Sequence, residues 1–90
     1  MELEIAESSS LKDKRQVVRS LVSRLKNRFN VAVAEVDYQD SWRNTALGIV
    51  CVSNSAGHAE RMLQEVIRYT TETRLDAEIG EHVIDVIEVA

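Results

Sequence analysis

The sequence contains no proline, one cysteine and three glycines among its 90 residues. Because Cys51 has no second cysteine to join, an internal disulfide and a metal knuckle built from several cysteines are both excluded. The three glycines, Gly48, Gly57 and Gly80, do not form the clustered loop that holds a phosphate group. These absences exclude a disulfide scaffold and a glycine-rich nucleotide site.

Long hydrophobic runs are also missing. No apolar stretch approaches the roughly 20 residues of a membrane-spanning helix. The chain begins MELEIAE, which is acidic where a secretory signal would be basic. With 44% hydrophobic and 29% charged residues, the composition is that of a folded globular protein. We therefore expect one soluble, cytoplasmic domain over residues 1–90, with no membrane partner.

Positive charge is concentrated in one segment. Residues 10–30 carry seven of the eleven Lys and Arg and one acidic residue, a net charge of +6. The rest of the chain has a net charge of −10, and it contains no Lys or Arg after Arg74. Such a segment on an acidic body can bind a polyanion, or it can pair with acidic residues of its own chain or a second copy.

The periodicity of residues 10–30 predicts an amphipathic helix. Leu11, Val18, Val22, Leu25 and Phe29 recur at helical spacing, and Ser10 is a suitable N-cap. Beside this apolar stripe, four cations fall within roughly 60° of one another at about 100° per residue. They form a row about 21 Å long, at about 1.5 Å of rise per residue. We call them the basic row: Lys12, Arg15, Arg19 and Lys26.

The remaining segments predict strands and a second helix. Apolar alternation or β-branched runs indicate strands at 2–5, 31–38 and 46–53 and within 77–89, and a helix from 54–55 to about Thr73. The order β-α-β-β-α-β is the ferredoxin-like split β-α-β plan, an α+β fold. Right-handed crossovers place both helices on one face of a four-stranded antiparallel sheet.

One face of this sheet is then uncovered. Residues 46–53 are apolar on both sides of their strand, and the last strand offers Val83, Ile87 and Val89 against Ile84 and Val86. Two helices cannot cover both faces, and an exposed apolar face of this size usually belongs to a partner. We therefore expect a homodimer that associates through sheet faces or edges.

Three segments together resemble the YlxP-like family of small bacterial proteins. They are SLKDKR at 10–15, RFNVAVAEV at 28–36, and DSW at 40–42 with VSN at 52–54. The resemblance covers nearly the whole chain and implies a ferredoxin-like fold and no established molecular function. Genes of the family often lie among translation-initiation and ribosome-maturation genes, which implies work near RNA. The chain departs from the family in a shorter first strand, in Ala6 where proline is frequent, and in Arg43 and Asn44 after Trp42.

Two features can bind RNA, and each has a structural alternative. The basic row can contact phosphates, or its side chains can cover the apolar stripe and pair with nearby carboxylates. Trp42 and Arg43 can stack on a base, or Trp42 can pack over a sheet edge or in a dimer contact. The sheet itself does not offer the aromatic residues that an RNA-recognition-motif domain needs on its central strands.

The titratable residues indicate no catalytic or metal site. Glu35 and Asp37 share a strand face without a calcium-loop pattern, so we interpret them as solvated charges. His58 begins the second helix and His82 lies on the last strand, both remote in sequence from Cys51, which we interpret as an inert core residue. We therefore expect no enzyme activity, no metal, no cofactor and no small-molecule ligand.

The interpretation we favour is a non-catalytic, dimeric protein that binds RNA or a ribosomal particle. The residues expected to contact the nucleic acid are Lys12, Lys14, Arg15, Arg19, Lys26, Trp42 and Arg43. The alternative is a self-assembling module without a nucleic-acid ligand, whose basic helix pairs with acidic strands of a neighbour.

Overall fold

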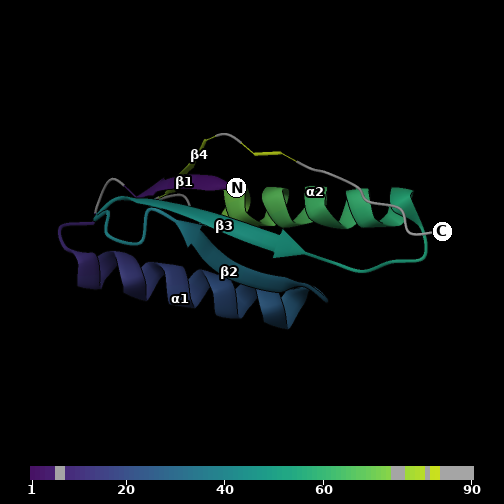
Figure 1. Ribbon diagram of the computed structural model, residues 1–90, viewed down its shortest axis with the longest axis horizontal. Coiled ribbons are helices and arrows are strands. Elements are labelled where there is room, and N and C mark those ends of the chain that lie inside the picture. The colour runs from purple at the N-terminus through teal and green to yellow at the C-terminus, as the bar shows by residue number, and fades with distance from the viewer. Residues whose placement is uncertain (6–7, 74–76, 81, 84–90) are drawn as a thin grey trace.

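A computed structural model describes residues 1–5, 8–73, 77–80 and 82–83. The chain is an α+β protein with two helices and an antiparallel sheet (Figure 1). Its elements are β1 (Glu2–Ile5), α1 (Leu11–Arg28), β2 (Ala32–Asp37), β3 (Asn44–Val50), α2 (Ala56–Thr73) and β4 (Ala77–Ile79). The predicted order of helices and strands is observed in this part of the chain.

Helix α1 begins and ends where the sequence pattern indicates. Ser10 is the N-cap, with extended backbone angles, and its side chain accepts a hydrogen bond from the backbone N–H of Asp13. The buried positions of the helix are Lys14, Val18, Leu21 and Leu25, which lie on one face at spacings of three and four residues. The first of these positions is a lysine, and it determines much of the geometry described below.

The sheet is built around β3. Strand β2 pairs with β3 through Val33 opposite Ile49, and β1 pairs with the other side of β3 through Leu3 opposite Thr45. The short β4 lies along β1, so the strand order is β2-β3-β1-β4. Strand β3 begins at Asn44 and ends at Val50, although composition predicts residues 46–53, because Asn44 pairs with Glu4 of β1.

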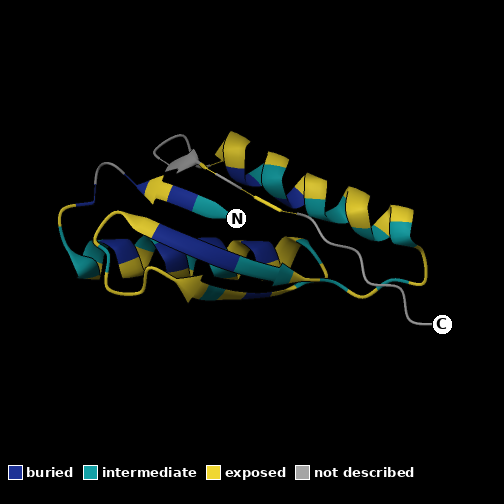
Figure 2. Ribbon diagram, turned by 45° about the horizontal axis from the view of Figure 1, so that its top comes forward, coloured by how far each residue is buried: buried dark blue, intermediate teal, exposed yellow. Residues whose placement is uncertain are grey.

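The hydrophobic core draws on both helices and on one set of strand positions. The buried cluster consists of Leu3, Val18, Leu21, Leu25, Val33, Leu47 and Val66. At its margin the Phe29 and Tyr69 rings meet edge to face, with their centroids 5.7 Å apart. Helix α1 lies along β2 and β3 with this buried surface turned toward them (Figure 2). The core therefore gives α1 a fixed inner face and leaves its other face in solvent.

The opposite face of β2 and β3 is apolar and exposed. Val36 is 60% exposed and Val50 is 63% exposed, while the alternate positions Val33 and Leu47 are buried. A Cβ at Gly48 would lie 2.9 Å from a methyl group of Val36, so the Val36 side chain lies against the Gly48 backbone on this face. Strand β3 thus has apolar residues on both sides, as predicted. On the side away from α1, Ala46 is buried, and the exposed part lies around Val36 and Val50.

Two expectations about single residues are wrong. Cys51 follows the end of β3 and is half-buried, so it is not part of the core. His82 lies beyond β4 in irregular backbone and is exposed, because the assigned strand ends at Ile79. The predicted apolar positions Ile84, Val86, Ile87 and Val89 lie outside the described residues.

Candidate functional site

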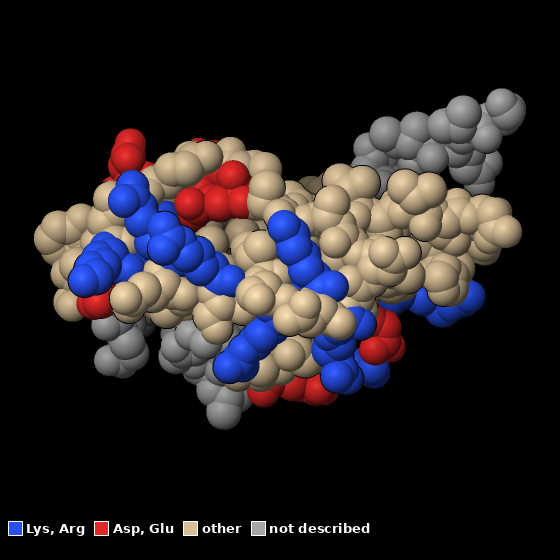
Figure 3. All heavy atoms as spheres, turned by 90° about the horizontal axis from the view of Figure 1, so that it is seen from below, with Lys and Arg blue, Asp and Glu red and all other residues tan. Residues whose placement is uncertain are grey.

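The basic row lies on the solvent-facing side of α1. Its residues, Lys12, Arg15, Arg19 and Lys26, are all exposed. Seen from the α1 side, Lys and Arg side chains lie in several groups across this face of the molecule, with Asp and Glu side chains among them (Figure 3). Within the described residues, the two ion pairs are Lys14–Glu35 and Arg68–Glu65, so none of the four cations of the basic row forms an ion pair with a described carboxylate, although the charge of Lys12 interacts with the neighbouring Asp13.

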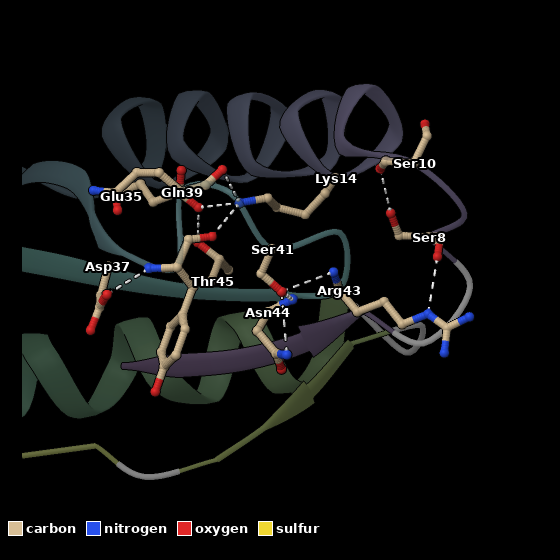
Figure 4. Close-up of polar contacts among 11 residues, drawn as sticks. Ser8, Ser10, Lys14, Glu35, Asp37, Gln39, Ser41, Arg43, Asn44 and Thr45 are labelled. Carbon is tan, nitrogen blue, oxygen red and sulfur yellow. Dashed lines mark hydrogen bonds and ion pairs between the residues drawn. The ribbon is translucent and has the colours of Figure 1, made fainter.

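Lys14 does not belong to this exposed surface, which corrects its assignment as a phosphate contact. Its side chain is fully buried and points inward beneath α1 (Figure 4). The ammonium Nζ lies 2.9 Å from Glu35 Oε2, 2.9 Å from the Tyr38 carbonyl oxygen and 3.3 Å from the Gln39 carbonyl oxygen. An ammonium group has three donors, and these three acceptors satisfy all of them. The lysine is therefore occupied by the protein itself.

Glu35 completes this interior cluster. Its carboxylate also accepts a hydrogen bond from the Thr45 hydroxyl on β3, and the Thr45 side chain is buried. The interpretation of Glu35 as a solvated strand charge is therefore wrong, because the strand alternation directs its side chain toward α1 together with Val33. Asp37 is exposed, as expected, beyond an irregularity in the strand register between Glu35 and Asp37.

The loop after β2 turns sharply at Tyr38. This residue has a φ of 62°, a left-handed backbone conformation that is uncommon for residues other than glycine. The Tyr38 carbonyl accepts from Lys14 Nζ and from the Ser41 backbone N–H at 3.0 Å. The buried lysine therefore holds a turn that carries an intrinsic conformational cost.

The end of the loop is fixed against the start of α1. The backbone carbonyl of Arg43 accepts from the Ile5 N–H, and the Arg43 Nε donates to the Ser8 carbonyl at 3.2 Å. The guanidinium group extends beyond this carbonyl at the N-terminal end of α1 (Figure 4). Trp42 is 58% exposed, so it does not pack fully over the sheet edge. Both loop residues thus lie on the surface, next to a segment that leads directly into the basic row.

The Asp13 carboxylate in the first turn of α1 accepts hydrogen bonds from Ser9. The Ser9 hydroxyl donates to Asp13 Oδ2 at 2.8 Å, and this hydrogen bond is the main reason that the pKa of Asp13 lies below its ordinary value of 3.8. A second hydrogen bond, from the Ser9 backbone N–H, lowers the pKa further. Asp13 is therefore held in its ionised form, where it stabilises the positive end of the helix.

The other described residues with reactive or metal-binding side chains make pairwise contacts and do not form a larger cluster. Within the described part of the chain, no group of three or more His, Cys, Asp or Glu is arranged to hold a metal ion. His58 Nδ1 lies 3.1 Å from the Ser53 hydroxyl, and the Cys51 thiol is 3.8 Å from the Ala59 carbonyl oxygen. The serine and histidine are within hydrogen-bond distance, but the contact is exposed to solvent, and within the described residues no third side chain orients the imidazole.

One hollow, of about 470 Å³, lies beside β1 and the start of β3. Its polar lining includes the carboxylates of Glu2 and Glu4 and the side chain of Asn44. The Tyr38 hydroxyl donates to Glu2 Oε1 at 3.1 Å. This surface is acidic and distinct from the basic row.

Among the helices of the described residues, none has the length and apolarity needed to cross a membrane.

Sequence reasoning placed the basic row correctly on one exposed helix face and missed the cluster beneath it. Lys14 lies four residues before Val18 and seven before Leu21, so its position in the apolar stripe is visible in the spacing. The partner, Glu35, is 21 residues away on a strand, and nothing in the helix indicates it. A lysine at a core position of a helix, with a carboxylate at a core position of a strand, is the signal that could have found this pair.

The comparisons with known proteins agree on one family. Residues 1–84 match the family described as a protein of unknown function, DUF503. The uncharacterized protein YlxP of Bacillus subtilis strain 168 is 42% identical over 65 residues, which cover 72% of this chain and 71% of that protein. The chain therefore belongs to the DUF503 family, which includes YlxP-like proteins and has no established molecular function.

Proposed function

We propose that this chain is a non-catalytic binding protein that docks the basic row of α1 onto RNA, either free or within a ribosomal particle. The observation that carries the proposal is the exposure of Lys12, Arg15, Arg19 and Lys26, none of which forms an ion pair with a described carboxylate. Each cation that meets a phosphate releases condensed counterions, and this release drives binding that does not depend on base sequence. Arg43, at the N-terminal end of α1, extends the same positive surface.

The charge of the whole chain sets the range of this interaction. A net charge of −4 repels a polyanion at long distance, so the basic row acts only when it is close to the phosphates. At the ionic strength of a cell, charges more than about 8 Å apart are largely screened, which removes most of this repulsion. With the four contacts of the basic row on a single strand, the logarithm of the affinity should fall by about 2.8 per unit of log salt.

The direct test is electrophoretic mobility of ribosomal RNA with the full chain at several salt concentrations. We expect a complex at low salt that weakens steeply as salt rises. The double variant Arg15→Glu and Arg19→Glu should abolish it, because each change removes a contact and adds a repulsive charge. Arg61→Glu, at an exposed position of α2, is the matched control and should leave binding nearly unchanged. No complex at low salt, or equal binding by the Arg15→Glu and Arg19→Glu variant, would contradict the proposal.

The fold and location that accompany this function are also proposals. The order β2-β3-β1-β4, with β4 beside β1, is the order that a ferredoxin-like domain requires, and it supports that arrangement for residues 1–90. A cytoplasmic location suits a protein whose ligand is RNA. Absence of enzyme activity is part of the same proposal.

A homodimer is favoured by the exposed apolar face of β2 and β3. We define this apolar face by Ala34, Val36, Gly48 and Val50, all on the side of the sheet away from α1. None of these residues is charged, and the face includes β2, which is an edge strand of the sheet. A second copy of the chain can cover it around a two-fold axis, because the same uncharged patch on each copy then meets its counterpart. The alternative module, in which the basic helix pairs with acidic strands of a neighbour, differs in being sensitive to salt.

A further inference from the structure

The interior contacts of Lys14 connect two parts of the surface that the sequence separates. We infer that Lys14 is a positioning residue, which fixes the loop at 38–43 so that Trp42 stacks on an unpaired RNA base while the basic row contacts adjacent phosphates. This inference rests on the proposed function and narrows its ligand to RNA with an unpaired segment. It also replaces the phosphate contact that the sequence had assigned to Lys14.

The first step concerns the loop itself. Tyr38 has a left-handed backbone, which is unfavourable for a residue other than glycine. Such a conformation persists only where surrounding contacts determine it. Lys14 Nζ supplies those contacts by donating to two successive carbonyls, those of Tyr38 and Gln39. Because the lysine is fully buried and paired with Glu35, the donor cannot move away from the loop.

The second step concerns the direction of the loop. Ser41 accepts hydrogen bonds from the backbone N–H groups of Arg43 and Asn44, at 3.4 and 3.1 Å. Arg43 is then held at both its backbone and its side chain, by Ile5 and Ser8. Trp42 lies between these two fixed points and is 58% exposed. The loop thus presents an aromatic ring on a short segment that is anchored at both ends.

The third step concerns the partner. The exposed Trp42 ring is followed by Arg43, whose side chain reaches the N-terminal end of α1, where the basic row begins. An exposed aromatic ring together with cations is the combination that binds single-stranded nucleic acid, where bases stack and phosphates meet cations. A perfect duplex offers phosphates to the basic row and keeps its bases stacked within the helix, out of reach of Trp42. The occupant is therefore an unpaired RNA segment. A duplex is the ligand that distinguishes stacking from charge alone.

The test uses the fluorescence of Trp42, which is the only tryptophan in the chain. The full chain is titrated with single-stranded poly(U) and, separately, with a poly(A)·poly(U) duplex, while binding is followed independently by mobility. We expect poly(U) to quench the emission and the duplex to bind without quenching. Trp42→Ala should weaken binding to poly(U) about tenfold, within the range measured for base–aromatic stacking, and should not affect the duplex.

The role of Lys14 is tested with Lys14→Met combined with Glu35→Gln, which removes the buried pair without leaving an unpaired charge. We expect this variant to lose the same tenfold in poly(U) affinity together with the quenching, and Trp42→Ala should cost it nothing further. The fall in log affinity per unit of log salt, which we call the salt slope, should equal that of the wild type, because Lys14 touches no phosphate. Lys12→Met is the matched control: the same change at an exposed position should reduce the slope by about 0.7 and retain the quenching.

The outcomes separate this inference from the proposed function. Salt-sensitive binding of poly(U) without quenching, or a lower salt slope in the Lys14 and Glu35 variant, would overturn the positioning role and leave the RNA ligand in place. Unchanged affinity and quenching in that variant would do the same. Absence of any RNA binding would overturn both. If circular dichroism shows that the variant is unfolded, the wild-type comparison decides, because equal quenching by the duplex contradicts stacking on an unpaired base.

Discussion

At the scale of single residues, the composition around Lys14 and its position in the helix give opposite predictions of whether its side chain is exposed or buried. It lies in the most basic segment of the chain, and this composition predicts an exposed side chain. It also lies in the apolar stripe of α1, and this position predicts a buried side chain. Burying an ammonium group is costly unless every donor finds an acceptor. Glu35 and two carbonyls of the following loop supply these acceptors, so position prevails over composition.

We predict that Lys14→Met lowers the free energy of unfolding by about 3 kcal/mol, because it leaves the half-buried Glu35 carboxylate without its cation. Glu35→Gln should also destabilise the fold. The two changes combined should cost less than the sum of the separate losses by at least about 1 kcal/mol. Urea denaturation followed by circular dichroism measures all three values. Strictly additive losses would mean that the pair is not coupled, and Lys12→Met should shift stability by less than about 0.5 kcal/mol.

At the scale of elements, α1 is the segment whose limits the sequence determines best. The predicted helix from Ser10 to about Phe29 is observed from Leu11 to Arg28, with Ser10 as its cap. Local chemistry is sufficient here, because the cap, the stripe and the last turn all lie within the segment. Strand β3 is different: its limits depend on pairing with β1, a partner at least 40 residues away in sequence, and composition predicted its start two residues too late.

The N-terminal turn of α1 gives a pH prediction. Because the pKa of Asp13 is lower in the folded chain than its ordinary value of 3.8, the ionised carboxylate stabilises the fold above that pH. The stabilisation should be lost as the pH falls through the lowered pKa. Urea midpoints measured from neutral to acidic pH should therefore show a difference between wild type and Asp13→Asn that shrinks on acidification.

Ser9→Ala is the control for this prediction, because the Ser9 hydroxyl is the main cause of the shift. In that variant the pKa of Asp13 should move back toward its ordinary value, and the acid-dependent part of the stability should become smaller. A difference between wild type and Asp13→Asn that is the same at every pH would show that the charge of Asp13 does not matter to the helix.

At the scale of the whole molecule, charge and apolar surface lie on different sides. The basic row occupies the outer side of α1, and the apolar face lies on the sheet side away from that helix. The two surfaces can therefore act at the same time, one on RNA and one on a second copy. Association through the apolar face would leave both copies of the basic row in solvent, and the presence of two rows would increase the affinity for a long RNA.

We predict a dimer at micromolar concentration, whose mass in sedimentation equilibrium does not change as salt is raised, because the contact is apolar. Val50→Lys should shift the molecule to monomer, since it places a charge within the apolar face at a position that is 63% exposed. Gln16→Lys adds the same charge at an exposed position of α1 and should leave the mass unchanged. A monomer in the wild type would contradict the homodimer, and an assembly that dissociates in salt would favour pairing between basic and acidic segments.

The sequence by itself determined the order of the described helices and strands, the limits of α1 and the exposed basic row, because each depends on residues within one turn or one strand of each other. Only the tertiary structure decided which lysine is interior, that Glu35 is its partner, and that the loop carrying Trp42 and Arg43 lies at the N-terminal end of α1. These contacts join residues more than 20 positions apart. Their geometry depends on the pairing register of the strands and on how α1 packs on the sheet, and no local sequence pattern encodes that arrangement.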